Sequence, residues 1–241
     1  MPSTATVMTA FSDTLRVSSL DDIAEAFDAK GAVIIQSNLS DVDLDTMLAF
    51  FANGAVEKKA HGDNPGRWRY RPRSDLAYAA LLGSSRLQDA LDILTDFSLR
   101  DCQEPGLHAD AWQYGNRGGD ETEPSTDNFQ ELHSDWPSYA NTSWKFGYGL
   151  VVSLALHDVP LELAPIRLVP WNKLKHSQQY PKLETDKFLQ GYEVTLKRGE
   201  LLIRDCRAAH GGCPNLDVQK ARMLPAVQVL SPQRLRYLGR L

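Results

Sequence analysis

A series of short strand-type runs, filling the chain from about residue 110 onward, constrains the fold more than any other feature. These runs are rich in β-branched and aromatic residues, and stretches dense in Gly, Pro, Asn and Asp separate them. Short strands with turn signals between them are typical of an antiparallel sandwich or barrel. The runs are AWQYG, FQELH, WKFGYGLVVSLALHDV, IRLVP, YEVTL, ELLIRD and MLPAVQVL.

The chain before these runs has helical spacing instead. After a loose lead at residues 1–17, apolar residues three and four apart predict helices that begin after Ser19, at Ser40 and at Ser85. The apolar run AVIIQ between the first two helices predicts a buried strand. Gly, Pro and alternating basic and aromatic residues predict that residues 54–75 are irregular.

We therefore expect a single domain over residues 1–241, with residues 19–100 as helical support and residues 110–230 as the β core. The 42% hydrophobic content supports one sizeable core, and no long Gly/Ser linker divides the chain. Helices first and antiparallel strands afterwards predict a mainly β fold, a jelly roll or barrel with helices packed on its outside.

Composition and charge exclude several classes of protein. A net charge of -5 gives no general electrostatic case for a nucleic-acid or anionic-membrane partner. Three cysteines without CxxC spacing argue against a disulfide framework and a Cys-rich zinc site. No apolar run approaches the ~20 residues of a membrane helix, and the N-terminus lacks the features of a secretory signal. We expect a cytoplasmic protein, and its oligomeric state stays open.

Three His-x-Asp pairs, beginning at His61, His108 and His133, are candidate metal ligands. Residues i and i+2 of a strand point to the same side, so one strand can supply two ligands of a 2-His-1-carboxylate iron site. Gly and Pro around His61 favour a loop. Spacing alone does not separate the pair at His108 from the pair at His133. Context favours His133 and Asp135, because a strand-type run precedes them and Trp136-Pro137 would end it.

The C-terminal segment offers a third ligand and an anion-binding residue. His210 follows the buried run ELLIRD and precedes a Gly-Gly turn, and Arg222 begins another strand. A guanidinium there suits the far carboxylate of a keto acid that chelates the metal. Arg204 and Arg207 are rival anchors, although salt bridges with Asp205 or surface acids are their expected role.

QELHSDW, followed by LIRDCRAAHGGCPN and Arg222, resembles the phytanoyl-CoA hydroxylase-like family of Fe(II)/2-oxoglutarate-dependent dioxygenases. AFDAKGAVIIQSNLSDVDLDTM also resembles the helix, strand and helix that open that family, so the likeness spans roughly residues 19 to 230. It implies a double-stranded β-helix (jelly-roll, cupin-like) core. Fe(II) would be held by His133, Asp135 and His210, and 2-oxoglutarate by Arg222, with O2 as the oxidant.

Two positions depart from the family pattern. Trp171-Asn172 replaces a Gly-Ser turn, and Gly212 stands where many members have Ser or Thr near the cosubstrate. Both departures concern the cosubstrate pocket rather than the metal ligands. Asp135 itself argues against the halogenating members, which need a small residue at that position.

Residues near these motifs have two roles open to them. Gln130 could hydrogen-bond the cosubstrate or serve as a structural strand amide. Trp136 and Tyr139 could wall the substrate pocket or pack as core or rim aromatics. RWRYRPR at residues 67–73 is expected to be a solvated strand or lid, and an Arg in it that holds a carboxylate-bearing substrate is the alternative.

The expected function is oxidation of an unactivated C–H bond of a small molecule, with release of succinate and CO2. Hydroxylation, desaturation, epoxidation and rearrangement all stay open, with specialised metabolism as the expected setting. A compact chain without a large insertion favours a small-molecule substrate. Two alternatives remain: a cupin-type metalloenzyme that does not use 2-oxoglutarate, and a jelly-roll binding module without catalytic activity.

Overall fold

A computed structural model describes residues 11–53, 56–60, 64–72, 78–102, 113–133, 135, 149–169, 191–206 and 208–231. The described helices are α2 (Ile23–Lys30), α3 (Asp41–Ala52), α4 (Ala79–Leu82) and α5 (Ser85–Cys102). The described strands are β1 (Ala32–Gln36), β2 (Val56–Ala60), β3 (Arg67–Pro72), β4 (Gln113–Thr122), β5 (Gly149–Leu154), β6 (Ile166–Leu168), β7 (Tyr192–Val194), β8 (Glu200–Asp205), β9 (His210–Gly212) and β10 (Arg222–Leu230).

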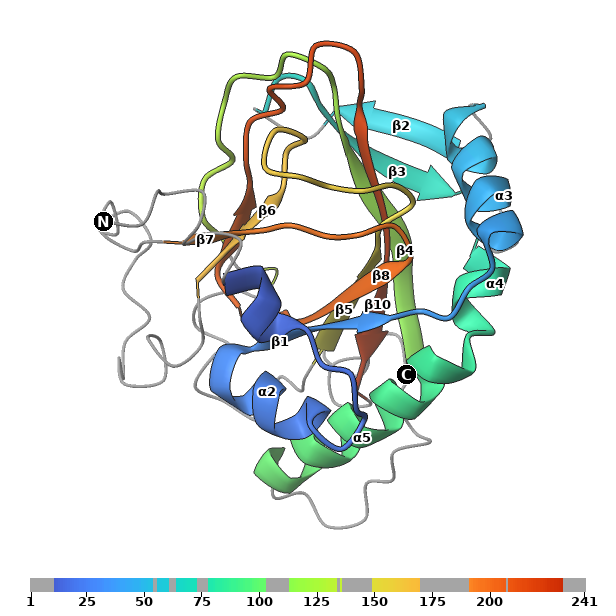
Figure 1. The fold of residues 1–241 in the computed structure, drawn as a ribbon, viewed down its shortest axis with the longest axis vertical. Coiled ribbons are helices and arrows are strands. Elements are labelled where there is room, and N and C mark those ends of the chain that lie inside the picture. Colours follow the sequence, from blue (N-terminus) through green and yellow to red (C-terminus); the bar gives the residue numbers. More distant parts are fainter. Residues whose placement is uncertain are drawn as a thin grey trace.

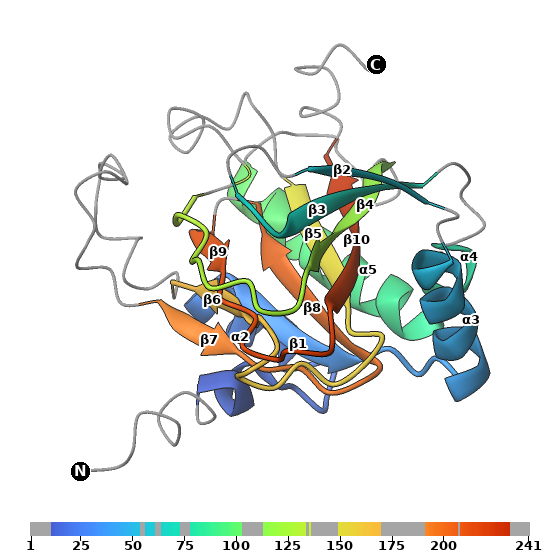
Figure 2. The ribbon, with the colours of Figure 1, turned by 90° about the horizontal axis from the view of Figure 1, so that it is seen from above.

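The strands form two antiparallel sheets. The larger has seven strands in the order β1-β8-β5-β10-β4-β3-β2, and the smaller has three in the order β7-β6-β9 (Figures 1 and 2). Neighbours in the sheets are mostly far apart in the sequence, as jelly-roll topology requires. The expected mainly β jelly-roll class is therefore confirmed. Within the described part of the chain, no helix has the length and apolarity needed to span a membrane.

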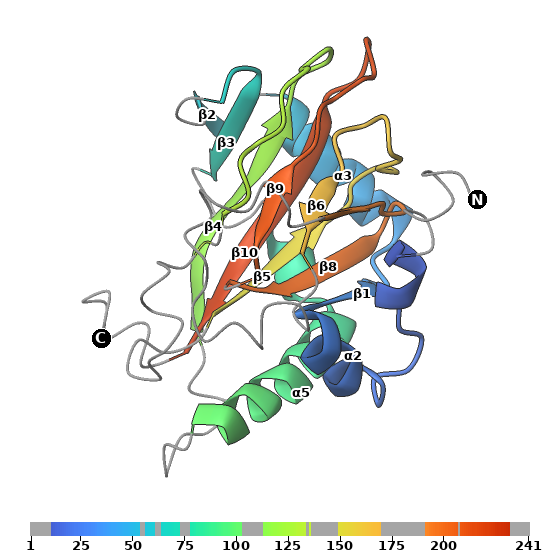
Figure 3. The same cartoon turned by 90° about the vertical axis from the view of Figure 1, so that its left-hand side faces the viewer.

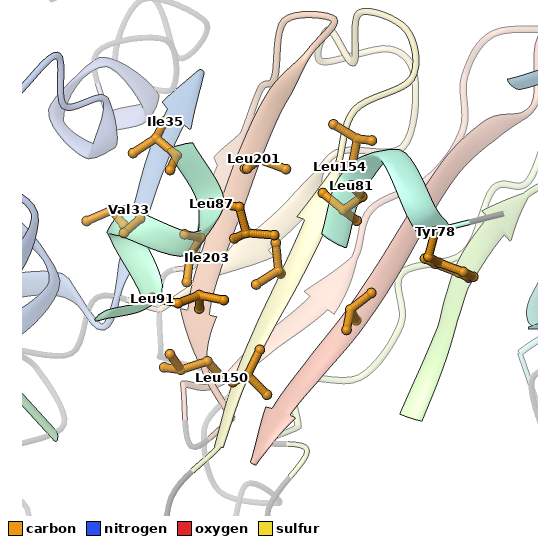
Figure 4. Close-up of a cluster of buried hydrophobic side chains, with 14 of the residues drawn as sticks. Val33, Ile35, Tyr78, Leu81, Leu87, Leu91, Leu150, Leu154, Leu201 and Ile203 are labelled. Carbon is orange, nitrogen blue, oxygen red and sulfur yellow. The ribbon is translucent and has the colours of Figure 1, made fainter. Parts of the chain in front are cut away.

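Alternation along the central strands gives the large sheet two apolar faces. Val33 and Ile35 of β1 belong to the cluster that α2 and α5 cover, and Leu87 and Leu91 of α5 lie beside Ile203 in Figure 4. Figures 1 and 3 show α2 beside α5, next to β1. The helices are thus packed on the outside of the β core, as predicted.

The opposite face of the large sheet looks toward the small sheet. Ile34 and Leu202 on that face share a buried cluster with Leu168 of β6 and Val194 of β7. Successive strand residues point to opposite faces, so every second residue of β8 counted from Leu202 points into the space between the sheets. Arg204, the next residue but one along β8, is among them.

The helix starts agree with the sequence in one case and differ in two. Ser40 caps α3 in a capping box with Asp43, as expected. Ser19 does not cap α2, because its hydroxyl accepts the backbone N–H of Asp21 before the helix begins. The cap of α5 is Ser84 rather than Ser85, since the Ser84 hydroxyl accepts the Leu87 N–H at 3.3 Å.

Four stretches of the β part also differ from expectation. Residues 54–75 were expected to be irregular, yet they contain β2 and β3, which pair with each other. The Gly-rich stretch NRGGDETEPSTDN was expected to separate two strands, yet its first part lies inside β4, where Gly119 has a φ of 147° and a Cβ would lie 2.5 Å from the Leu224 carbonyl. The Gly-Gly pair after His210, expected as a turn, lies in β9. FQELH is not a regular strand, and within it only His133 makes a β-bridge.

Candidate active site

The site is built around the backbone pairing of His133 with His210. Each residue donates its N–H to the carbonyl of the other at 2.8 Å, and the two imidazole rings lie with centroids 4.4 Å apart. Asp135, two residues after His133, completes the group. One ligand atom from each of His133, Asp135 and His210 lies within 4.8 Å of the other two. The structure therefore brings together the three residues that the sequence proposed as metal ligands.

The Nδ1 of His133 lies 2.9 Å from the Glu131 carbonyl, and the Nδ1 of His210 lies 2.9 Å from the Ala208 carbonyl. A carbonyl can only accept, so both Nδ1 atoms carry a proton, and Nε2 is the atom of each ring that is left to bind a metal ion. Backbone carbonyls that fix the tautomer in this way are common behind histidine metal ligands.

Arg204 sits against two of the three residues. Its Nη2 donates to Asp135 Oδ2 at 2.7 Å, and its Nη1 lies 3.3 Å from His210 Nδ1. The second contact competes with the Ala208 carbonyl for Nδ1, and the shorter distance favours the carbonyl. Arg204 thus forms a salt bridge, as expected, but its partner is Asp135 instead of Asp205 or a surface acid.

The charges at this site favour metal-binding protonation states. Burial is the largest single influence on the pKa of Asp135 and would raise it, but the charge and hydrogen bond of Arg204, together with the neighbouring His210 and His133, outweigh it and hold that pKa well below its usual range. Burial, with the Arg204 charge added, lowers the pKa of His210 far below its ordinary value. At neutral pH the site therefore has a carboxylate and a neutral imidazole, the forms that bind metal ions.

Arg222 lies at the start of β10, where its side chain is 3% exposed. Its Nη2 donates to Thr122 Oγ1 at 2.9 Å, and its Nε is buried with no partner among the described residues. Burial lowers the pKa of Arg222. A buried cation with one neutral hydroxyl as its described partner is costly unless an anion joins it. This arrangement fits the predicted keto-acid anchor.

Arg67 of β3 is a second buried cation at the same place. The sequence offered an Arg of RWRYRPR as a carboxylate holder without choosing among them, and it expected this stretch to be solvated, whereas Arg67 is buried. Its Nη1 also donates to Thr122 Oγ1, at 3.1 Å, and its Nη2 donates to the carbonyls of Asn128 and Cys213. Burial, reinforced by the charge of Arg222, lowers its pKa to about 10. The sequence signal that could have pointed to Arg67 is the alternation along the strand, which places Arg67 and Arg69 on the same face.

Gln130 has a structural contact in this arrangement. Its side-chain oxygen accepts the N–H of Gly212 at 3.0 Å, and its own N–H donates to the Gly212 carbonyl at 2.9 Å. It thereby ties the segment before His133 to β9. The structural-amide alternative is thus present, and a bond to the cosubstrate stays a prediction.

Several predicted residues lie outside the described part of the chain. They are Trp136, Tyr139, Arg207, the pairs at His61 and His108, and Trp171-Asn172. His157, which lies outside the ligand group, accepts the backbone N–H of Met223 through Nε2 at 3.1 Å. Cys206 and Cys213 are buried free thiols.

No family model matches the chain, and neither does any of the curated proteins compared with it. Solved structures do match. EvdO2 from Micromonospora carbonacea var. aurantiaca, complexed with 2-oxoglutarate, superposes with a TM-score of 0.58 at 15% identity, covering 86% of this chain and 89% of that one. HygX from Streptomyces hygroscopicus, with nickel, 2-oxoglutarate and hygromycin B bound, gives 0.59 at 14% identity over 88% and 87%.

A third match is the epimerase SnoN in complex with Fe3+, alpha ketoglutarate and nogalamycin RO. It has a TM-score of 0.57 at 15% identity and covers 92% of this chain and 90% of that one. At such identities the likeness shows the fold alone. The chain shares its jelly roll with non-haem, 2-oxoglutarate-binding proteins, and it carries a His-Asp-His group that could hold a metal ion.

Proposed function

We propose that the chain is a non-haem Fe(II)- and 2-oxoglutarate-dependent oxygenase, related to the phytanoyl-CoA hydroxylase-like family and working as one catalytic domain. It would oxidise an unactivated C–H bond of a small molecule and release succinate and CO2. One observation carries the proposal. Three metal-type ligand atoms lie within 4.8 Å of one another in the same jelly roll as Arg222, a buried guanidinium without a described acid partner.

The residues present fit an iron ion. Two neutral imidazoles and one carboxylate are the donor set of the facial triad of non-haem iron oxygenases. His133 and His210 would bind through Nε2, and Asp135 through its carboxylate. When bound, Fe(II) would supply the activation of O2 that is coupled to decarboxylation of 2-oxoglutarate.

The protein's own contribution is to hold, orient and exclude water. The Arg204 guanidinium fixes the Asp135 carboxylate at 2.7 Å, so the ligand is positioned before a metal arrives. Arg222 would bind the far carboxylate of 2-oxoglutarate and set the direction of the keto acid. Leu168 and Leu224 belong to the buried apolar cluster between the two sheets, which would exclude water from that side of the site.

A small-molecule substrate is also part of the proposal. SnoN with nogalamycin RO and HygX with hygromycin B support it by analogy of fold. Trp136 and Tyr139 remain the proposed wall of the substrate pocket. A cytoplasmic location is proposed because the buried thiols of Cys206 and Cys213 suit a reducing compartment.

The test is an anaerobic titration of the full chain with Fe(II) and 2-oxoglutarate, followed by measurement of O2-dependent succinate release. Wild type should bind both and release succinate, while Asp135→Ala should lose metal binding. His157→Gln is the matched control, because it removes a half-buried imidazole that lies outside the ligand group.

The outcomes separate the alternatives. Failure of wild type to bind Fe(II) would favour a binding module without catalytic activity. Metal binding that is unaffected by 2-oxoglutarate, together with an Arg222→Met variant that behaves like wild type, would favour a cupin-type enzyme.

A further inference from the structure

Two buried guanidiniums meet on one hydroxyl in the space between the sheets. Arg67 and Arg222 are 4% and 3% exposed, and they donate to Thr122 Oγ1 at 3.1 Å and 2.9 Å respectively. Thr122 is the register partner of both residues in the large sheet. Arg67, Thr122 and Arg222 therefore occupy one row across β3, β4 and β10, and the strand pairing itself holds the two charges side by side.

These two cations form no ion pair with a carboxylate of the described residues. In the part of the chain that the structure describes, neither has a carboxylate within ion-pair distance, and Asp120 acts on both from farther away. The Nη2 of Arg67 is occupied by the carbonyls of Asn128 and Cys213. The Nε atoms of both arginines are buried without a described partner. The two buried positive charges repel each other, and a bound anion would reduce this repulsion.

Gly212 makes room for the second guanidinium. A Cβ on Gly212 would overlap Nη1 of Arg67, so any other residue at this position would displace the guanidinium from the hydroxyl of Thr122. Gly212 also lies two residues after His210 on β9, and this spacing is about 6.6 Å along a strand. The pair of arginines thus begins one strand repeat away from a proposed metal ligand.

We propose that Arg67 and Arg222 together clamp the far carboxylate of the keto acid, with Gly212 as the position that admits Arg67. This inference rests on the proposed function and adds a second binding residue to it. Two guanidiniums provide more charge-assisted donors than one and favour an oxo acid with a second carboxylate over an oxo acid that ends in a methyl group. The clamp would therefore determine which keto acid the site accepts.

Calorimetric titration of the nickel-loaded full chain tests the clamp without requiring turnover. The ligands are 2-oxoglutarate and 2-oxopentanoate, which has the same carbon chain length and keto-carboxylate end but lacks the far carboxylate. Arg67→Met should weaken 2-oxoglutarate binding about 10- to 100-fold, the loss expected for charged hydrogen bonds. The same variant should leave 2-oxopentanoate binding unchanged. Arg69→Met is the matched control, because Arg69 is an exposed neighbour on the same strand, and it should change neither.

A second variant acts on the clamp without deleting an arginine. Gly212→Ser should displace the Arg67 guanidinium and weaken 2-oxoglutarate in the wild-type background. In the Arg67→Met background that space is free, so the same serine should cost nothing or restore part of the affinity. This non-additivity separates a shared site from general damage to the fold. It also keeps the test decisive if Arg67→Met alone does not fold.

Failure of this inference differs from failure of the proposed function. If wild type binds 2-oxoglutarate, Arg222→Met abolishes binding, and Arg67→Met and Gly212→Ser both bind like wild type, then Arg67 is a structural residue and the clamp is refuted. Equal losses for 2-oxoglutarate and 2-oxopentanoate would refute it as well. If nickel-loaded wild type binds neither ligand, the proposed function itself is refuted.

Discussion

Replacing Arg222 with Met should have opposite effects on the ligand-free and ligand-bound protein. In the ligand-free protein the substitution removes a buried charge whose described partner is one hydroxyl, and it relieves the repulsion on Arg67. Apolar replacement of buried ions is often neutral or stabilising by about 1–4 kcal/mol. We therefore expect the free energy of unfolding of the ligand-free variant to equal or exceed that of wild type.

With ligand the order should reverse. At 2-oxoglutarate concentrations about 100-fold above Kd, wild type should gain about 2.7 kcal/mol, which raises the Tm of a chain of this size by about 5–10 °C. Losing two charged hydrogen bonds costs about 3–6 kcal/mol and weakens binding by more than about 100-fold. The variant should then gain at most about 0.4 kcal/mol at the same concentration, or about 1 °C.

The assay is thermal unfolding followed by circular dichroism, with nickel present and with or without 2-oxoglutarate. Arg198→Met is the control, since Arg198 makes an exposed salt bridge with Asp45 and should keep the full ligand shift. The reasoning is refuted if the Arg222 variant loses more than about 2 kcal/mol of ligand-free stability, a loss typical of breaking a satisfied buried pair. It is equally refuted if 2-oxoglutarate still raises the Tm of that variant as in wild type.

Three further predictions concern the surroundings of the site. Arg204→Met should lower metal affinity by about 10- to 100-fold, because Asp135 loses the partner that orients it, and nickel titration would measure this. His157 has its pKa lowered by burial, so the unfolded chain binds the extra proton first as the pH falls below about 6.5. His157 should accordingly cost wild type up to about 1.4 kcal/mol per pH unit between that pH and its lowered pKa in the folded chain, and His157→Gln should make the fall of Tm on acidification less steep. Ile203→Ala should cost about 2–5 kcal/mol in urea unfolding, because Ile203 is fully buried under α5; a loss below 1 kcal/mol would contradict this packing.

Local pattern predicted two of the buried strands closely. AVIIQ and ELLIRD match β1 and β8 residue for residue, because strands buried on both faces are continuous apolar runs with few alternatives. The edge formed by β2 and β3 was predicted less well, because pairing as much as hydrophobicity defines these strands. RWRYRPR was expected as a solvated strand or lid, and it becomes β3 through its pairing with β2 and β4 and the burial of Tyr70 in the core.

The candidate site also contains residues that local pattern predicts and contacts that depend on strand pairing. His133, Asp135 and His210 could be proposed from spacing and strand context, since each lies in a recognisable local pattern. The partnership of Arg204 with Asp135 spans 69 residues, and the meeting of Arg67 with Arg222 depends on which strands flank β4. No local pattern contains such register information. Alternation along β8 does place Arg204 on the same face as Leu202, so the direction of its side chain could be predicted from the sequence although its partner could not.

The reciprocal hydrogen bonds between His133 and His210 have a consequence for how such a chain can change. Two of the proposed ligands are fixed to each other by main-chain bonds of 2.8 Å, so their spacing is independent of the side chains around them. The entropic cost of closing a loop grows only slowly with its length. Insertions between Asp135 and β5, which leave Arg204 and the paired strands in place, should therefore keep the ligand geometry intact, and laboratory evolution of new substrates can concentrate on that interval.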